Sequence, residues 1–177
     1  RSLSDTSITA LAADAEGKLW VGTEMGGLHH LDPAPETVVV YRHDPSSPQS
    51  LTSDHLLALL IDRTGAVWVG TNGEGVNRLD PKTGKFTPYL PGVGVTALAE
   101  NEHGAIVVGT YGAGLMVLDP KSGEALPFAT SAEIPVDTLM IRALQIDRRG
   151  RVWAGTGSHG LLRVDPEHAE ALNFVGY

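Results

Sequence analysis

The stretch "GTNGEG" at residues 70–75 is the part of the sequence that looks most like a ligand-binding loop. Glycine loops that cradle phosphate connect a strand to a helix whose N-terminus faces the anion. Here the stretch is followed by "VNRLDP", a strand-like run ending in Asp-Pro, and the sequence contains no Gly-Lys-Ser/Thr. The stretch therefore predicts a turn between two strands and argues against a phosphate site.

Histidines and acids are the other residues that could do chemistry. His29 and His30 are adjacent, and neighbours on a strand point to opposite faces, so they cannot jointly bind one metal ion. The chain has no cysteine, no His-x-His pair and no recognisable Ser-His-Asp grouping. Four aspartates each precede a proline, which is typical of turns: Asp32, Asp80, Asp119 and Asp165. We expect no metal, no cofactor and no catalytic residue.

The glycine-rich stretch belongs to a phrase that occurs four times. The copies are "GKLWVGTEMGGLHHLDP" from residue 17, "GAVWVGTNGEGVNRLDP" from 65, "GAIVVGTYGAGLMVLDP" from 104 and "GRVWAGTGSHGLLRVDP" from 150. The glycines of their Gly-Thr pairs are Gly22, Gly70, Gly109 and Gly155, which are 48, 39 and 46 residues apart. A period of roughly 40–50 residues is typical of propellers and solenoids.

Each repeat is predicted to form four short strands, named A to D. Strand A is an apolar run that ends in an acid or amide, and a four-residue turn with Gly at its last position follows, as in Asp62–Gly65. Strand B carries the tryptophan in three copies, and strand C ends at Asp-Pro because proline cannot donate to a sheet ladder. Strand D completes the repeat. Four-stranded sheets at this period are propeller blades, which bury their faces by stacking.

The sequence therefore predicts an all-β fold, a β-propeller made of four-stranded antiparallel blades, over residues 1–177. The four blades are expected at about 7–42, 55–89, 93–128 and 140–175. Four blades lie at the low end of the usual range, so we expect part of a larger propeller or a ring completed by a second chain. The strand B tryptophans should lie between blades, and the Gly-Thr glycines should permit close blade approach: Trp20, Trp68, Trp153 and the four glycines above.

Composition excludes some partners. The formal net charge is −8, which argues against nucleic acid or an anionic membrane as partner, because phosphate binding needs a basic surface. No run of 18 apolar residues is present, so we expect no membrane contact by this segment itself. The first residues, "RSLSD", read as the interior of a longer chain, and we expect it to continue upstream.

The second repeat, residues 41–89, resembles the two-component regulator propeller repeat. The matching elements, in order, are Ser50-Leu51, Asp62–Gly65, Trp68 with Gly70-Thr71, Gly75-Val76 and Asp80-Pro81. The third repeat departs from the pattern, with Val107 in place of the tryptophan and Asn101 in place of the turn aspartate. The fourth has Ala154 between its tryptophan and glycine.

The resemblance implies a sensor region of a bacterial hybrid histidine kinase, on the periplasmic or extracellular face of the inner membrane. In that family seven repeats typically close one propeller, and glycan fragments are often the ligands. The implied partners are thus a small-molecule or oligosaccharide ligand, together with further propeller blades or a second chain.

Strand direction predicts where a ligand would bind. Antiparallel strands alternate, so the B–C turns and D–A connections emerge at one end of every blade. These connections vary between repeats, and variable loops on a rigid scaffold tend to carry recognition. Tyr111 could offer a stacking face and a hydroxyl. The candidate ligand-binding residues are Glu24, Met25, Asn72, Glu74, Tyr111, Ser158 and His159.

The leading hypothesis is a non-catalytic, ligand-sensing propeller segment of a two-component receptor. A protein-interaction scaffold is an alternative, since propellers commonly present one face to a partner. A second alternative is an enzyme resembling streptogramin lyases, which need a base and a metal-binding acid near the channel. Glu74 and His159 could be offered for those roles, two repeats apart.

Overall fold

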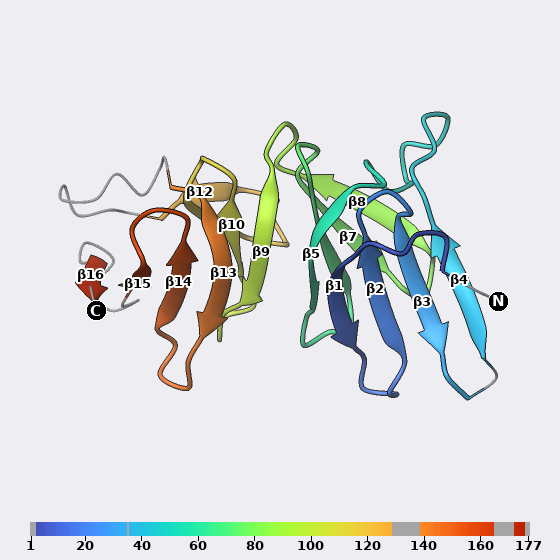
Figure 1. Cartoon of the computed structure of the whole chain (residues 1–177), viewed down its shortest axis with the longest axis horizontal. Coiled ribbons are helices and arrows are strands. Elements are labelled where there is room, and N and C mark those ends of the chain that lie inside the picture. Colours follow the sequence, from blue (N-terminus) through green and yellow to red (C-terminus); the bar gives the residue numbers. More distant parts are fainter. Residues whose placement is uncertain (1–2, 35, 129–138, 165–171, 176–177) are drawn as a thin grey trace. The chain divides into compact units, whose positions relative to one another are not determined.

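All regular elements of the described chain are β-strands. The computed structural model describes residues 3–34, 36–128, 139–164 and 172–175. Its strands form four antiparallel four-stranded sheets, each with its strands in chain order (Figure 1). The predicted fold class, all-β with propeller blades, is therefore confirmed. Within the described ranges, no helix combines the length and the apolar character needed to cross a membrane.

The sheets are named blades 1 to 4, and their strands keep the letters A to D. Blade 1 is β1 (Ile8–Ala13), β2 (Leu19–Thr23), β3 (Leu28–Asp32) and β4 (Thr37–Tyr41). Blade 2 is β5 (Leu56–Ile61), β6 (Val67–Thr71), β7 (Val76–Asp80) and β8 (Lys85–Tyr89). Blade 3 is β9 (Val95–Glu100), β10 (Ile106–Thr110), β11 (Leu115–Leu118) and β12 (Ala125–Pro127). Blade 4 is β13 (Ile141–Ile146), β14 (Val152–Thr156), β15 (Leu161–Val164) and β16 (Leu172–Val175).

The chain divides into two compact units, residues 1–95 and 96–177. Unit 1 contains blades 1 and 2 together with Val95, the first residue of β9. Unit 2 contains the rest of blade 3 and blade 4. Each unit is described by itself below.

The aspartates of the A–B turns in blades 2 and 4 do more than initiate the turn. In blade 2, Asp62 Oδ1 accepts hydrogen bonds from the backbone amides of Thr64 and Ala66, at 2.8 and 3.0 Å. Its other oxygen, Oδ2, accepts one from the indole Nε1 of Trp68 at 2.8 Å. In blade 4 the corresponding bond joins Trp153 to Asp147 at 3.0 Å. The turn role was predicted; the bond to the tryptophan was not.

Trp20 and Trp68 each contact the residue that lies opposite them on strand C. Trp20 stacks on His30 with ring centroids 3.9 Å apart, and Arg78 lies over Trp68 at 5.7 Å. Blade 3 replaces the whole group, since Asn101 stands in the turn and Val107 faces Val117. Asn101 still caps its turn through Oδ1, with amide bonds of 3.0 and 2.9 Å. Loss of the indole therefore coincides with loss of the acid that accepts its hydrogen bond.

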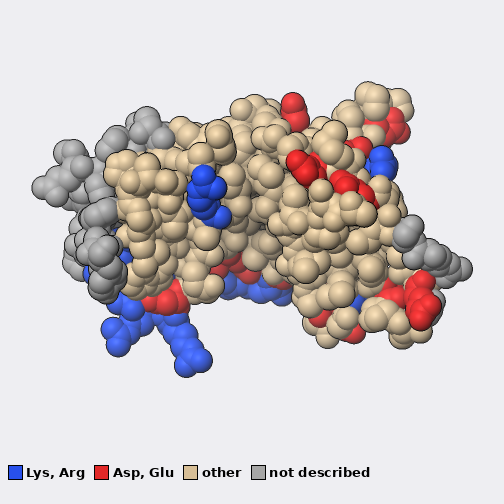
Figure 2. All heavy atoms as spheres, viewed as in Figure 1, with Lys and Arg blue, Asp and Glu red and all other residues tan. Residues whose placement is uncertain are grey.

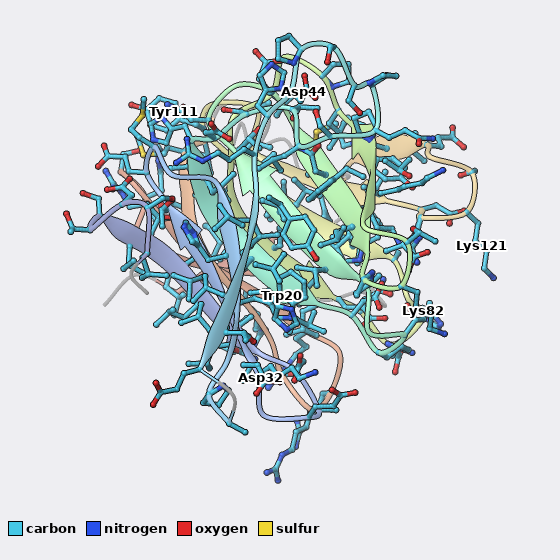
Figure 3. The ribbon with its side chains drawn as sticks, turned by 90° about the vertical axis from the view of Figure 1, so that its right-hand side faces the viewer. Trp20, Asp32, Asp44, Lys82, Tyr111 and Lys121 are labelled. Carbon is cyan, nitrogen blue, oxygen red and sulfur yellow. The ribbon has the colours of Figure 1, made fainter. Side chains whose placement is uncertain are left out.

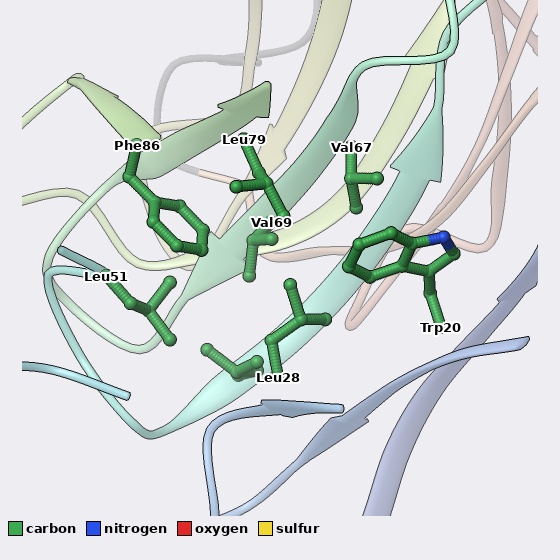
Figure 4. Packing of buried hydrophobic residues seen from close by; sticks show 8 residues of the cluster. Trp20, Leu28, Leu51, Val67, Val69, Leu79 and Phe86 are labelled. Carbon is green, nitrogen blue, oxygen red and sulfur yellow. The ribbon is translucent and has the colours of Figure 1, made fainter. Parts of the chain in front are cut away.

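The core of unit 1 lies between the facing sides of blades 1 and 2. Trp20 and Leu28 of blade 1 pack against apolar side chains of blade 2, among them Val67 and Leu79 (Figure 4). Leu51, from the D–A connection, belongs to the same buried cluster. The full buried set is Trp20, Leu28, Leu51, Leu56, Val67, Val69, Leu79 and Phe86. Trp20 and Trp68 are buried as predicted, whereas Trp153 is only half-buried.

The Gly-Thr glycines let neighbouring blades approach closely, as predicted. A Cβ atom at Gly70 would lie 2.7 Å from the Val95 side chain, a distance that real Cβ contacts do not reach. At Gly22 a Cβ would meet the side chains of Leu56 and Leu59 at 3.5 Å, which is ordinary contact. Gly70 is therefore required by packing rather than by backbone conformation.

Replacing Asp62 with asparagine tests the aspartate–indole bond. The asparagine side chain would keep the turn acceptor but place an amide NH2 against the Trp68 N–H, leaving a buried donor unsatisfied. We expect Asp62→Asn to lower the free energy of unfolding by about 1–3 kcal/mol in urea titrations. The matched control is Asn101→Asp, beside Val107, which should change stability by less than about 0.5 kcal/mol. Equal losses in both variants would contradict the assignment.

The turn aspartates also predict acid sensitivity. Burial raises the pKa of Asp62, but hydrogen bonds from Thr64, Trp68 and Ala66 outweigh it and hold the pKa below 3.8. Hydrogen bonds from the side chains of Arg151 and Trp153 likewise lower the pKa of Asp147. A lowered folded-state pKa stabilises the fold above the unfolded value and loses that contribution below it. The melting temperature should therefore fall as pH drops below about 4, and fall less steeply in Asp62→Asn. A melting temperature independent of pH there would contradict this.

Candidate functional site

The B–C turns and the D–A connection meet at one end of unit 1. The amide of Gly27, in the blade 1 turn, donates to the Asp54 carbonyl at 3.1 Å, and the Thr52 hydroxyl donates to the Glu74 carbonyl in the blade 2 turn at 3.2 Å. The connection therefore touches both turns. In Figure 3, Asp44 of this connection stands at the top, whereas Asp32, from a C–D turn, lies toward the bottom. The predicted grouping of loops is confirmed for this unit.

Unit 2 has the same arrangement around Leu139 and Met140. The amide of Gly114, in the blade 3 turn, donates to the Leu139 carbonyl at 3.2 Å. The amide of Gly157, in the blade 4 turn, donates to the Met140 carbonyl at 2.9 Å. The residues just before β13 thus join the two B–C turns of this unit.

A threonine hydroxyl fixes the backbone of every B–C turn. In blade 2, Thr71 Oγ1 donates to the Gly75 carbonyl at 2.8 Å and accepts from the Glu74 amide at 3.1 Å. Gly75 has a positive φ of 78°, and a Cβ there would lie 2.2 Å from the Tyr89 carbonyl oxygen. The equivalent threonines in the other blades are Thr23, Thr110 and Thr156, each bonded to the glycine four residues later at 2.9 Å. We call this arrangement the threonine clamp.

The sequence reasoning missed the threonine clamp. Its signal was the threonine that follows the strand B glycine in all four repeats. The clamp matters for the site because it holds the turn backbone while the side chains between the threonine and the last glycine point into solvent. All seven candidate ligand-binding residues occupy such positions and are exposed.

Four of the candidates lie in unit 1: Glu24, Met25, Asn72 and Glu74. Met25 is 67% exposed, and its amide donates to Asp5 Oδ2 at 2.7 Å. Hydrogen bonds from the Ser7 and Met25 amides lower the pKa of Asp5, which keeps its carboxylate charged. The Asn72 amide nitrogen lies 3.2 Å from Nδ1 of His55. The B–C turns of this unit, together with the residues just before each strand A (the lead-in segments), thus present carboxylates, an amide and an imidazole.

The other three candidates lie in unit 2. Tyr111, labelled in Figure 3, lies in the blade 3 B–C turn. Its side chain is 65% exposed, and its backbone forms a β-bridge with Met140. Ser158 Oγ lies 2.8 Å from Nδ1 of His159. A Cβ built at Gly157 would lie 3.6 Å from Nε of Arg142, so this guanidinium borders the same turn. Unit 2 thus presents an aromatic ring together with hydroxyl, imidazole and guanidinium groups.

The candidates therefore fall into two groups, one on the loop face of each unit. Four residues that lie beside the candidates were not predicted as part of the site: Asp5, His55, Met140 and Arg142. They precede or begin strand A, and no repeated motif marks them. Figure 2 shows that the basic side chains of the blade 4 A–B hairpin, residues 147–150, project from the opposite end of that blade.

Buried polar residues on strand C anchor the lead-in segments to the first two blades. The Ser4 amide donates to His29 Nε2 at 3.1 Å, and the Thr52 amide donates to Asn77 Oδ1 at 3.2 Å. His29 and Asn77 are both fully buried, and burial lowers the pKa of His29. His29 and His30 point to opposite faces, as predicted, since His30 stacks on Trp20. Across the described residues, no three histidine, aspartate or glutamate side chains are grouped so that they could hold a metal ion.

Sequence comparison identifies the repeat type. Residues 2–25 match the family described as "Two component regulator propeller". The match covers strands A and B of blade 1 and the residues before them, whereas the resemblance described from the sequence lay in the second repeat. This stretch thus matches a repeat of that family, and the predicted resemblance is confirmed. None of the curated proteins matches the chain in sequence.

Solved structures share the fold at low identity. The chain is similar to the extracellular domain of a proposed hybrid two component system from B. thetaiotaomicron, with TM-score 0.78 and 21% identity over 98% of this chain and 22% of that one. A second such domain from the same organism has a TM-score of 0.70 and 19% identity, over 100% of this chain and 30% of that one. Virginiamycin B lyase from Staphylococcus aureus has a TM-score of 0.77 and 15% identity, over 98% of this chain and 56% of that one. The chain thus spans about a fifth of the length of the first solved structures that it matches.

Removing the Thr71 hydroxyl tests the threonine clamp. Thr71→Val leaves the Gly75 carbonyl and the Glu74 amide without their side-chain partner, so we expect a loss of about 1–3 kcal/mol in unfolding free energy. Amide exchange at Glu74 should also become faster. Thr71→Ser is the matched control, because it keeps the hydroxyl, and its Glu74 amide should stay protected. If valine and serine behave alike, the clamp does not order the turn.

Proposed function

We propose that this chain is a segment of the ligand-binding propeller of a bacterial two-component receptor. The observation that carries the proposal is the match of residues 2–25 to the two component regulator propeller family. The likeness to extracellular domains of two component systems supports it at the level of fold. By analogy with those proteins, the segment would lie on the periplasmic or extracellular side of the membrane. Further blades or a second chain would complete the propeller.

The proposed ligand is an oligosaccharide. Sugars present hydroxyl groups around an apolar ring face, and proteins bind them through hydrogen-bonding side chains beside an exposed aromatic ring. Tyr111 supplies a ring that is 65% exposed. Arg142, Ser158 and His159 supply donors and acceptors within the same unit. An aromatic side chain with a polar tip suits a ligand that is apolar on one side and wet on the other.

The proposed role is binding rather than catalysis. The candidates are side chains on clamped turns, and three of them also form hydrogen bonds through their backbone. Met25 and His159 donate through their amides, and Glu74 takes part through both its amide and its carbonyl. The lyase likeness, at 15% identity, is a likeness of fold. Glu74 and His159, the pair considered for lyase chemistry, belong to different units.

The test is binding of a panel of soluble oligosaccharides, measured by glycan array and then by titration calorimetry. We expect Tyr111→Ala to weaken the affinity for the bound sugar roughly tenfold, or about 1.4 kcal/mol, because the stacking face is removed. Its melting temperature should stay near that of the parent, since the ring is mostly exposed. Leu126→Ala is the matched control, as an exposed apolar residue on β12 of the same blade.

Two outcomes would oppose this proposal. A large fall in the melting temperature of Tyr111→Ala would show that the ring is structural. Absence of binding to every sugar, with intact folding, would count against an oligosaccharide ligand and favour a protein partner at the same loops.

A further inference from the structure

Three of the four Gly-Thr glycines face the same position of the following repeat. In each case a Cβ placed on the glycine would meet the first residue of strand A in the next repeat. The pairs are Gly22 with Leu56 at 3.5 Å, Gly70 with Val95 at 2.7 Å and Gly109 with Ile141 at 2.6 Å. The fourth, Gly155, would meet only Ala143 of its own blade, at 3.7 Å or more. One glycine of the series therefore has no partner among the described residues.

The first residue of strand A is buried in three blades and exposed in the other. Leu56, Val95 and Ile141, which meet the glycines, are fully buried. Their counterpart in the first repeat, Ile8, is 41% exposed. Among the described residues, Gly155 of blade 4 and Ile8 of blade 1 therefore lack a contact of this kind.

The face of blade 1 that points away from blade 2 is apolar and hollowed. Its cross-strand row Leu19, Leu31 and Val38 occupies the register positions of Val67, Leu79 and Phe86 in blade 2. Those three blade 2 residues are buried in the cluster that contains Trp20. In blade 1 the row is uncovered: Leu19 is 41% exposed, and the three side chains line a pocket of about 560 Å³. The pocket lies where blade 2 receives the indole of blade 1.

Blade 4 presents the matching face. Trp153, Gly155 and Leu161 stand at the register positions of Trp20, Gly22 and Leu28. In blade 1 that face is covered by blade 2, and Trp20 and Leu28 are buried. In blade 4, Trp153 is half-buried and Leu161 is 38% exposed.

Charged groups border both faces. Trp153 is flanked by Arg151 and Arg163, whose guanidinium carbons lie 5.7 and 5.9 Å from its ring. Arg151 already pairs with Asp147 in its own chain, so Arg163 supplies the cation of this face. The pocket on blade 1 is bordered by Asp32 and Glu36, and Asp32 lies 3.7 Å from Lys18. Opposite charges at the rim of a contact favour correct encounter and register.

We propose that two copies of this chain associate head to tail through these faces. The Trp153 face of one copy packs on the outer face of blade 1 of the next, with the indole in the pocket lined by Leu19, Leu31 and Val38. Gly155 then lies against Ile8, which repeats the contact of Gly22 with Leu56. Such a contact joins different surfaces of the two copies, so it either closes into a ring or continues as an open chain. The association does not depend on ligand binding.

The experiment measures the mass of the 177-residue chain by light scattering and sedimentation velocity from about 1 to 100 μM. We expect assemblies of two or more copies. Gly155→Ile should give monomers, because a Cβ at this position makes only ordinary contact with Ala143 in its own chain, whereas the isoleucine side chain collides with Ile8 of the next copy. Leu31→Glu should also give monomers, because it places a charge in the pocket. Leu126→Glu, at an exposed position outside both faces, is the control and should assemble like the parent.

Mixing the two interface variants tests the head-to-tail geometry. Each variant keeps one intact face, so the mixture should form dimers with a single contact and no larger assembly. A parent chain that stays monomeric at about 100 μM would overturn the proposal and leave both faces to other blades. Assembly that survives both substitutions would also overturn it, because a different surface would then be responsible. Circular dichroism melts of each variant check that loss of assembly is not loss of folding.

Discussion

The contact of one blade face with the next is the interaction on which the rest of this structure depends. A four-stranded sheet has two faces, and strands as short as these cannot form a core within one blade. Trp20 on blade 1 is buried because Val67 and Leu79 of blade 2 cover it. The close approach also brings the D–A connection over the seam, where Leu51 joins the buried cluster and Asp54 meets the blade 1 turn. The loop face that carries the candidate residues is therefore a product of blade stacking.

The repeated sequence made the fold predictable. Four copies of one phrase reveal the strands, the turns and the blade period together, and each copy supports the interpretation of the others. The role of Gly70 followed from the same reasoning, because a glycine at the centre of a β-branched strand needs a packing reason. The half-buried Trp153 was not foreseen, since a repeated position was expected to have the same surroundings in every blade.

The sequence predicted which end of the blades carries the candidate site, but not which side chains contact one another there. Strand direction alone places the B–C turns beside the D–A connections. The hydrogen bonds that order the turns at both ends of a blade were not predicted, because each residue that makes them has another role that already explains its presence. Asp62 reads as a turn residue and Thr71 as a strand residue. Their bonds to Trp68 and to the Gly75 carbonyl appear only when the chain is folded. Arg142 belongs to strand A by sequence, and only the structure sets it beside a B–C turn.

The threonine clamp has a consequence for how such a protein can change over generations. The hydroxyl and the glycine fix the path of each turn, so the exposed side chains between them are not needed to hold it. Glu-Met-Gly, Asn-Gly-Glu, Tyr-Gly-Ala and Gly-Ser-His stand at equivalent places in one chain. Repeats can therefore be duplicated, exchanged or shuffled by recombination while the scaffold tolerates each new turn. A lineage built this way can acquire new recognition by point changes at the exposed turn positions, while Gly26 stays constrained by packing and Gly73 and Gly112 by their positive φ.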